Sequence, residues 1–105
     1  MAGTRVRFTP AVTDALLRHE KARARELRQS GWWKRRVAVG VCHYCRRHTG
    51  AKALTMDHVV PLIRGGRSTR GNVVPSCKDC NSKKQARLPW EWDTYLQALG
   101  RAETD

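Results

Sequence analysis

The sequence predicts a single α+β domain over residues 1–105, in which two short strands lie between helices and a bound metal ion staples the fold. Three observations predict it: two Cys-x-x-Cys pairs, short β-favouring apolar runs between them, and helix-forming segments at both ends. Only 7% of the residues are aromatic, so the hydrophobic core is small. A domain of this kind needs a staple, and structural zinc is the one that the cysteines offer.

The first predicted element is a basic helical extension over residues of about 9–40. Thr9 and Pro10 match an N-cap and a first-turn proline, and helix-forming residues continue to Gln29, before Ser30 and Gly31. Basic side chains cover much of this helix: Arg18, Lys21, Arg23, Arg25 and Arg28. They form either a solvated face or a phosphate-contacting one.

Residues 32–41 allow two interpretations. Alternating valines at 37, 39 and 41 match a short strand, whereas the stretch to Val39 with Gly40 as its stop matches a helix. We favour the helix. Trp32 and Trp33 at its start serve either as core residues or as groups that stack on bases.

The central core of about residues 41–87 contains the predicted strands and a following helix. An apolar, β-rich run covers residues 54–61, a loop with Gly65 and Gly66 covers 63–71, and Val73 and Val74 form a short second strand. A helix is predicted from Lys78 to about residue 87. A final helix over about 89–99 has apolar residues spaced to cover a hydrophobic face.

Charge points to a polyanionic partner. Lys and Arg number 21 against 9 Asp and Glu, for a formal charge of +12, and nucleic acid is the usual partner of such a field. A basic surface without chemistry is the alternative. No apolar run approaches the roughly 20 residues of a membrane span, and the N-terminal MAGTRVRFTP lacks a signal-peptide core. We therefore expect no membrane association and a cytoplasmic location, where cysteines stay reduced and bind metal.

The four cysteines have the spacing of a tetrahedral zinc site. Each short pair can turn two thiolates toward one ion at about 2.3 Å. A redox pair is disfavoured, because there are two pairs and no thioredoxin-type sheet. His43 or His48 is an alternative ligand that four cysteines make unnecessary. The predicted ligands are Cys42, Cys45, Cys77 and Cys80.

Asp57, His58 and Asn81 carry groups suited to phosphodiester hydrolysis. His58 can be neutral near physiological pH and accept a proton, while Asp57 and Asn81 offer oxygen atoms to a Mg²⁺-like ion. Neighbouring side chains of a strand point to opposite faces, so Asp57 and His58 either flank a phosphate or lie where the strand bends. In isolation, Asp57 could cap a turn and His58 could be structural.

Read whole, residues 42–84 resemble the HNH endonuclease family in its zinc-bound, four-cysteine form. The resemblance rests on CHYC at 42–45, MDHVVPL at 56–62, GG at 65–66, NVVPSC at 72–77 and CNSKK at 80–84. It implies a ββα-metal fold, a β-hairpin followed by a helix, and a metal-dependent nuclease. Asn81 stands where the family name has histidine, a departure that other members share.

The resemblance also implies the role of each site residue. His58 is the general base, Asp57 and Asn81 bind a catalytic Mg²⁺ or another divalent ion such as Mn²⁺ or Ni²⁺, and Asn72 positions the active-site loop and the base. The cysteines hold structural zinc. Basic residues of the loop and the following helix are candidate DNA contacts: Arg64, Arg67, Arg70, Lys83 and Lys84.

The predicted function is therefore a DNA endonuclease of low sequence specificity that nicks or cleaves. The alternative is a non-catalytic zinc-ribbon DNA-binding or accessory module, which has no need for the Asp57, His58 and Asn81 set together with Asn72. Small stand-alone HNH proteins similar to this one occur in phages and prophages, and some act with the packaging terminase. The sequence leaves open the substrate, the preferred ion and whether the protein is a monomer or a homodimer.

Overall fold

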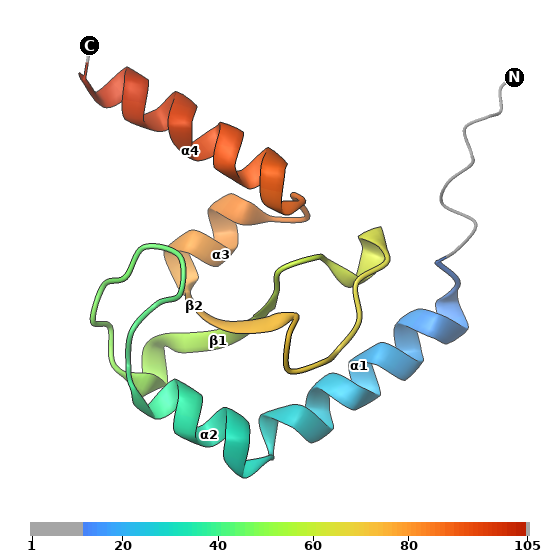
Figure 1. Ribbon diagram of the computed structural model, residues 1–105. Helices are drawn as coiled ribbons and strands as arrows, with labels where there is room; N and C mark the ends of the chain where they lie inside the picture. The colour runs from blue at the N-terminus through green and yellow to red at the C-terminus, as the bar shows by residue number, and fades with distance from the viewer. Residues whose placement is uncertain (1–11, 105) are drawn as a thin grey trace, which may run out of the picture.

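A computed structural model describes residues 12–104 and places a two-stranded sheet between helices (Figure 1). Two helices precede the sheet, one follows it directly, and a last one extends from the rest. The elements are α1 (Asp14–Arg28), α2 (Gly31–Ala38), β1 (Leu54–His58), β2 (Val73–Cys77), α3 (Lys78–Lys84) and α4 (Pro89–Thr104), with 3₁₀ turns η3 (Ala51–Ala53) and η4 (Leu62–Arg64). Figure 1 shows α1 and α2 on one side of the sheet and α3 on the other.

The strands form an antiparallel hairpin. Leu54 pairs with Cys77 and His58 pairs with Val73, so both ends of β1 are matched by β2. Every residue of β2 is buried, and α3 begins at the residue after it. The hairpin and helix confirm the predicted ββα arrangement within an α+β fold.

Of the helices before the sheet, α1 begins later than the sequence predicts, whereas α2 ends before Gly40 as predicted. Thr9 and Pro10 lie outside the described residues; α1 begins at Asp14, because the Thr13 hydroxyl accepts from the Leu16 amide and caps it there. Ser30 then caps α2 by accepting from the Trp33 amide. The helix preferred over a strand for this stretch is confirmed, and a left-handed Gly40 (φ +77°) follows it.

Other boundaries shift. β1 ends at His58 rather than Pro61, β2 extends to Cys77, and α3 ends at Lys84 rather than near residue 87, because Gln85 turns to a positive φ of 52°. The last helix continues past residue 99 to Thr104. A single glycine at 100 did not end it, because the residues after it, Arg-Ala-Glu-Thr, tolerate helix.

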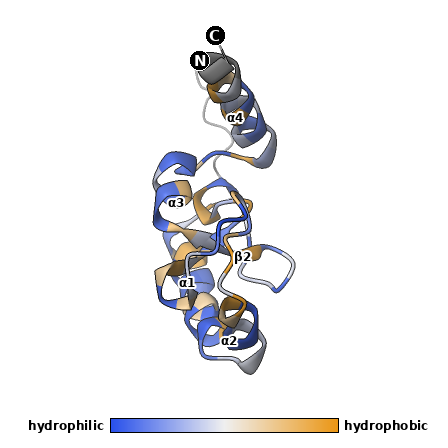
Figure 2. Cartoon of the chain, turned by 90° about the vertical axis from the view of Figure 1, so that its left-hand side faces the viewer, coloured by the Kyte–Doolittle hydropathy of each residue, from blue (hydrophilic) through white to orange (hydrophobic). Residues whose placement is uncertain are grey.

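The buried core gathers around the cysteines. Cys42, Leu54, Cys77 and Cys80 are buried together, with Val37, Tyr44 and Cys45 packed against them. Figure 2 shows hydrophobic residues along β2, at the centre of the molecule. Two of the four tryptophans, at positions 33 and 92, are buried, while the one at 90 is 65% exposed. Within residues 12–104, no helix has the length and apolar character of a membrane span.

Candidate functional site

The four predicted zinc ligands come together. Cys42 and Cys45 lie in the turn after α2, Cys77 ends β2, and Cys80 lies in the first turn of α3. Their Sγ atoms all lie within 4.8 Å of one another, and those of Cys45 and Cys77 are 3.9 Å apart. Sulfur atoms about 2.3 Å from a tetrahedral zinc ion stand about 3.8 Å from each other. The donor set and its spacing therefore fit one metal ion.

Hydrogen-bond donors surround these sulfurs. The Cys77 amide donates to Cys42 Sγ, and Arg47 Nε donates to Cys45 Sγ at 3.2 Å. Burial alone would raise the pKa of Cys45, but the hydrogen bonds to its sulfur, of which the one from the Arg47 side chain is the strongest, together outweigh burial and lower this pKa to about 6. Burial raises the pKa of Cys80, with thiol neighbours adding to the effect. A thiolate suited to metal binding is thus favoured at the exposed edge of the cluster.

Asp57 is buried and tied on one oxygen. Its Oδ2 atom accepts a 2.6 Å hydrogen bond from the Tyr44 hydroxyl and lies 3.2 Å from Lys84 Nζ. Burial, followed by the bond to Asp57, raises the pKa of Tyr44, so this hydroxyl stays a donor. Within residues 12–104, Oδ1 of Asp57 has no hydrogen-bond or ion-pair partner. That oxygen is available to a cation.

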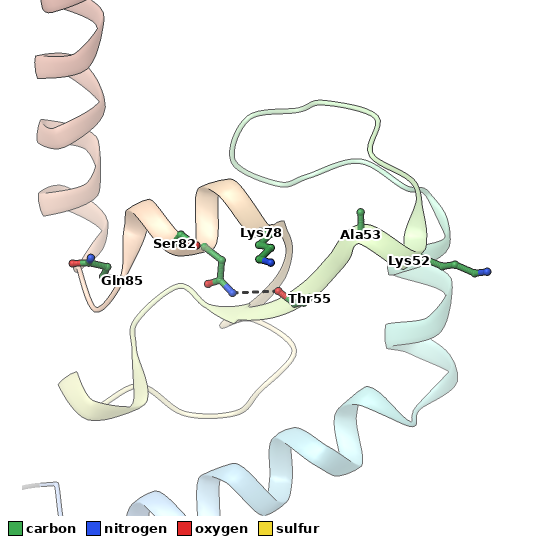
Figure 3. A pocket seen from close by; sticks show the side chains of 7 residues that line it. Lys52, Ala53, Thr55, Lys78, Ser82 and Gln85 are labelled. Carbon is green, nitrogen blue, oxygen red and sulfur yellow. Dashed lines mark hydrogen bonds between the residues drawn. The ribbon is translucent and has the colours of Figure 1, made fainter.

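Asn81 faces the same interface between β1 and α3. Its Nδ2 donates to Thr55 Oγ1 at 3.2 Å, the dashed line in Figure 3. Thr55 and Asp57 share one face of β1, since they are two residues apart, and Asn81 and Lys84 share one side of α3. The Asn81 to Thr55 and Lys84 to Asp57 contacts therefore place the two predicted metal ligands along one seam.

A pocket of about 580 Å³ opens beside Asn81 (Figure 3). Its lining brings together residues of the η3 turn, β1, α3 and the α3 C-cap, most of them polar or basic: Lys52, Ala53, Thr55, Lys78, Asn81, Ser82 and Gln85. Sequence reasoning did not single out Lys52 and Lys78, which give this pocket positive charge. Two cations beside a candidate metal ligand suit a phosphodiester backbone.

The His58 ring bonds to the loop between the strands. Its Nε2 atom lies 2.9 Å from Ser68 Oγ, and Ser68 in turn bonds to Glu20 of α1. Burial lowers the pKa of His58, while the Asp57 carboxylate opposes this change. The ring is therefore neutral at physiological pH. Asp57 and His58 bond to different elements, as the alternation of side chains along a strand predicts.

Asn72 closes the loop between the strands. Its Oδ1 accepts from the Val60 amide, and its Nδ2 donates to the carbonyls of Val60 and Arg67. Gly66 allows the close approach: a Cβ atom there would lie 1.8 Å from the Val60 carbonyl oxygen. Gly65 has a left-handed φ of 94°. These contacts support the loop-holding role expected of Asn72.

The two lysines of α3 that were predicted to contact DNA differ in exposure. Lys83 is about half exposed and pairs with Asp79. Lys84 is 1% exposed, and its ammonium bonds to Asp57 and to the His58 carbonyl. The expectation that Lys84 grips DNA beside Lys83 is therefore wrong for this structure, because the shared helix does not give the two residues a shared face.

The loop arginines also have partners within the protein. Arg64 forms two hydrogen bonds with Glu91 of α4, and Arg67 pairs with Glu20 at 3.2 Å. The guanidinium of Arg70 lies 5.3 Å from the centre of the Trp32 ring. Each can reach DNA only by sharing or leaving that partner.

Besides Lys52 and Lys78, three further site residues were missed from the sequence: Glu20, Tyr44 and Ser68. Tyr44 lies inside the first cysteine pair, whose spacing points only to the sulfurs. Glu20 had a signal, because it lies four residues before the buried Ala24 and is an acidic residue in the stripe that α1 buries. Ser68 gave none, since the sequence does not show which loop residues face a helix.

The comparison with known families points to the same part of the chain as this geometry. A family model described as HNH endonuclease matches residues 42–94, which include all four cysteines, the hairpin, α3 and the start of α4. The helices α1 and α2 precede the matched region. A comparison with curated proteins gave no match.

Proposed function

The chain belongs to the HNH endonuclease family, and we propose that it is a metal-dependent DNA endonuclease that nicks a phosphodiester backbone with little sequence preference. The observation that carries the proposal is the interface between β1 and α3. Asp57 of β1 contacts α3 there, Asn81 of α3 contacts β1, and a basic pocket opens beside Asn81. A carboxylate and an amide oxygen suit a hard divalent ion such as Mg²⁺. A protein that only binds DNA has no need for this donor pair.

The protein's own groups divide the work. His58, half-buried and neutral, takes a proton from an attacking water. Tyr44 and Lys84 hold Asp57 by one oxygen and leave the other available. Asp57 and Asn81 would hold a divalent ion, which would supply positive charge to the phosphate and to the leaving oxygen. Asn72 keeps the loop that follows His58 closed.

Zinc at the cysteines is the proposed structural metal. Four thiolates without an open coordination position are typical of structural rather than catalytic zinc. Cys77 and Cys80 border the hairpin and α3, so zinc would fix the helix that carries Asn81. The two metals thus have separate roles: zinc stabilises the fold, and only the ion at Asp57 and Asn81 would take part in cleavage.

DNA is the proposed substrate because of charge. The chain carries a formal +12, and the exposed Lys52 and Lys78 line the pocket. One site per chain cuts one strand, so a double-strand break needs two chains or successive nicks. Work with a phage packaging terminase remains a prediction of the sequence resemblance, and the DNA-binding module remains the alternative.

A plasmid assay tests the proposal. Purified protein is incubated with supercoiled plasmid and Mg²⁺, Mn²⁺, Ni²⁺ or EDTA, and nicked and linear products are separated on a gel. We expect nicking with at least one ion and none in EDTA. Folded His58→Ala should lose about 10²- to 10⁴-fold in rate, the usual contribution of a general base. Binding without cleavage under every ion would favour the DNA-binding module instead.

A further inference from the structure

From the contacts of His58, we infer that α1 completes the catalytic site: through Ser68, Glu20 of α1 holds the His58 ring in the tautomer that leaves Nδ1 free to accept a proton. The inference rests on the proposed function for its consequence, though not for its geometry. It matters because α1 lies outside residues 42–94, the part of the chain that matches the family. Glu20 and Ser68 are positioning residues that act through His58.

Hydrogen-bond donors and acceptors fix the direction of this relay. Ser68 Oγ lies 2.6 Å from the backbone oxygen of Glu20, and a carbonyl oxygen can only accept. Ser68 therefore donates its single hydroxyl proton to the backbone oxygen of Glu20. Ser68 Oγ must then accept from His58 Nε2, 2.9 Å away, so that nitrogen carries the hydrogen. In the neutral ring, the lone pair lies on Nδ1.

The two positioning residues of the relay, Glu20 and Ser68, are buried in the interior of the protein. Ser68 is 0% exposed and Glu20 is 2% exposed. The Glu20 carboxylate accepts from the Ser68 amide at 2.6 Å, and its other oxygen pairs with Arg67. The bond from the Ser68 amide, supported by Arg67, keeps the pKa of Glu20 below its ordinary value despite burial. Burying a carboxylate is costly unless it is bonded in this way, and here all its bonds go to the loop that holds His58.

Two bonds between the same residue pair give the relay its rigidity. Ser68 donates its amide to the Glu20 side chain and its hydroxyl to the Glu20 backbone. The oxygen that meets His58 is thereby fixed in position and orientation. Outer partners of this kind decide which nitrogen of a histidine is protonated and how the ring is turned. The loop's own anchor, Asn72, bonds at Val60 and Arg67 and does not reach Ser68.

Variants separate the relay from general packing. Ser68→Ala removes the acceptor for His58 Nε2, and Glu20→Ala removes the carboxylate that holds Ser68. Glu20→Gln keeps an oxygen for the Ser68 amide and serves as the conservative replacement. Ser76→Ala is the matched control, because Ser76 is also 0% exposed but its hydroxyl bonds only to the Cys77 carbonyl.

Two readouts are needed for each variant. Nitrogen-15 NMR of the zinc-loaded protein reports which ring nitrogen of His58 carries the hydrogen, without any need for activity. Nicking kinetics separate kcat from KM. We expect Ser68→Ala and Glu20→Ala to shift the ring away from the Nε2–H tautomer and to lower kcat about 10- to 100-fold, the usual effect of losing an outer partner. KM for plasmid should stay within about twofold, Glu20→Gln should recover most of kcat, and Ser76→Ala should match the parent in both readouts.

The outcomes distinguish this inference from the proposed function. If Ser68→Ala is folded and keeps both the parent tautomer and the parent kcat, the relay is refuted while the nuclease assignment stands. If Ser68→Ala loses the parent tautomer and rate while Glu20→Ala keeps both, the part played by the Glu20 carboxylate is refuted, because Glu20→Ala still offers its backbone oxygen to the Ser68 hydroxyl. If the parent protein does not cut under any ion, the NMR result still decides whether Glu20 and Ser68 set the His58 tautomer.

Discussion

Lys84 Nζ lies 3.2 Å from Asp57 Oδ2, and the lysine side chain is 1% exposed. The pair crosses the same seam as the bond between Asn81 and Thr55, so it joins α3 to β1 at the site itself. Lys84 thus supports the fold and orients Asp57, whereas its neighbour Lys83 faces solvent. Two adjacent lysines therefore have separate tasks.

This difference predicts unequal effects of the same substitution. Lys84→Met leaves the Asp57 carboxylate buried without its counter-charge and should cost about 3 to 5 kcal/mol of the free energy of unfolding. Lys83→Met breaks only a half-exposed pair with Asp79 and should cost under about 1 kcal/mol. Urea denaturation of the zinc-loaded variants measures both. Equal costs would mean that Lys84 does not occupy the interior.

Tyr44→Phe should weaken the catalytic ion without unfolding the protein. The change removes the hydroxyl that donates to Asp57 and keeps the ring, which packs edge-on against Trp92. Loss of a partner that orients a ligand costs about 10- to 100-fold in metal affinity or activity. Nicking should therefore need more Mg²⁺ for half-maximal rate. Tyr95→Phe, whose ring also stacks on Trp92, is the control and should keep the parent ion dependence.

The pH dependence of cleavage should follow His58. Its pKa lies below the ordinary 6.5, chiefly because the half-buried ring is partly withdrawn from water, and a cation at Asp57 would lower it further. Because the base must be neutral, the rate should rise with pH through this pKa and level off above it, so the rising limb lies on the acid side of 6.5. A profile of single-turnover nicking rates measures this. Absence of the limb in the parent, or its persistence in His58→Ala, would contradict the assignment.

Zinc should be inseparable from folding. Apparent zinc affinities of about 10 to 16 kcal/mol in small domains match or exceed the roughly 5 to 15 kcal/mol stability of a whole domain. Metal analysis should find about one zinc per chain, and Cys42→Ser or Cys80→Ser should unfold or precipitate the protein, as circular dichroism would show. A zinc-free preparation with the parent spectrum would rule out this role.

The two predicted ligands of the catalytic ion should respond differently to mild replacement. Asn81→Asp keeps an oxygen donor and should stay partly active. Asp57→Asn keeps the size of the side chain but removes the charge that pairs with Lys84, so its defect should include lost stability. Higher Mg²⁺ should recover part of the nicking rate only for variants that remain folded, which denaturation curves establish first.

The features predicted best from sequence are those carried by short local patterns. The cysteine pairs fix which sulfurs converge, and the residues between them fold as a hairpin and helix because strand-favouring runs are followed directly by a capped helical segment. The tight turn at Gly66 was also readable, since the close approach there requires a residue without a Cβ atom. The loop-holding role of Asn72 was expected from the family resemblance, and its bond from the Val60 amide is consistent with that role.

What the sequence did not reveal depends on contacts across long separations. Lys83 and Lys84 look alike along the chain, and only the docking of α3 on β1 decides which of them is buried. Glu20 and Ser68 stand 48 positions apart, so no local pattern connects them. The start of α1 has a simpler cause: Thr13 supplies a cap that the sequence reading passed over, and the helix begins after it at Asp14.

The seven residues of α3 are too few to hold a helix in water unaided. The helix is instead fastened at two points, by Cys80 at the cysteine cluster and by Lys84 at Asp57, with Asn81 between them. One residue inserted between these points would rotate Lys84 by about 100° around the helix axis, and both fastenings could not then be satisfied. The number of residues from Cys80 to Lys84 is therefore set by the distance between the two contacts, and an insertion or deletion between them would break one of the two.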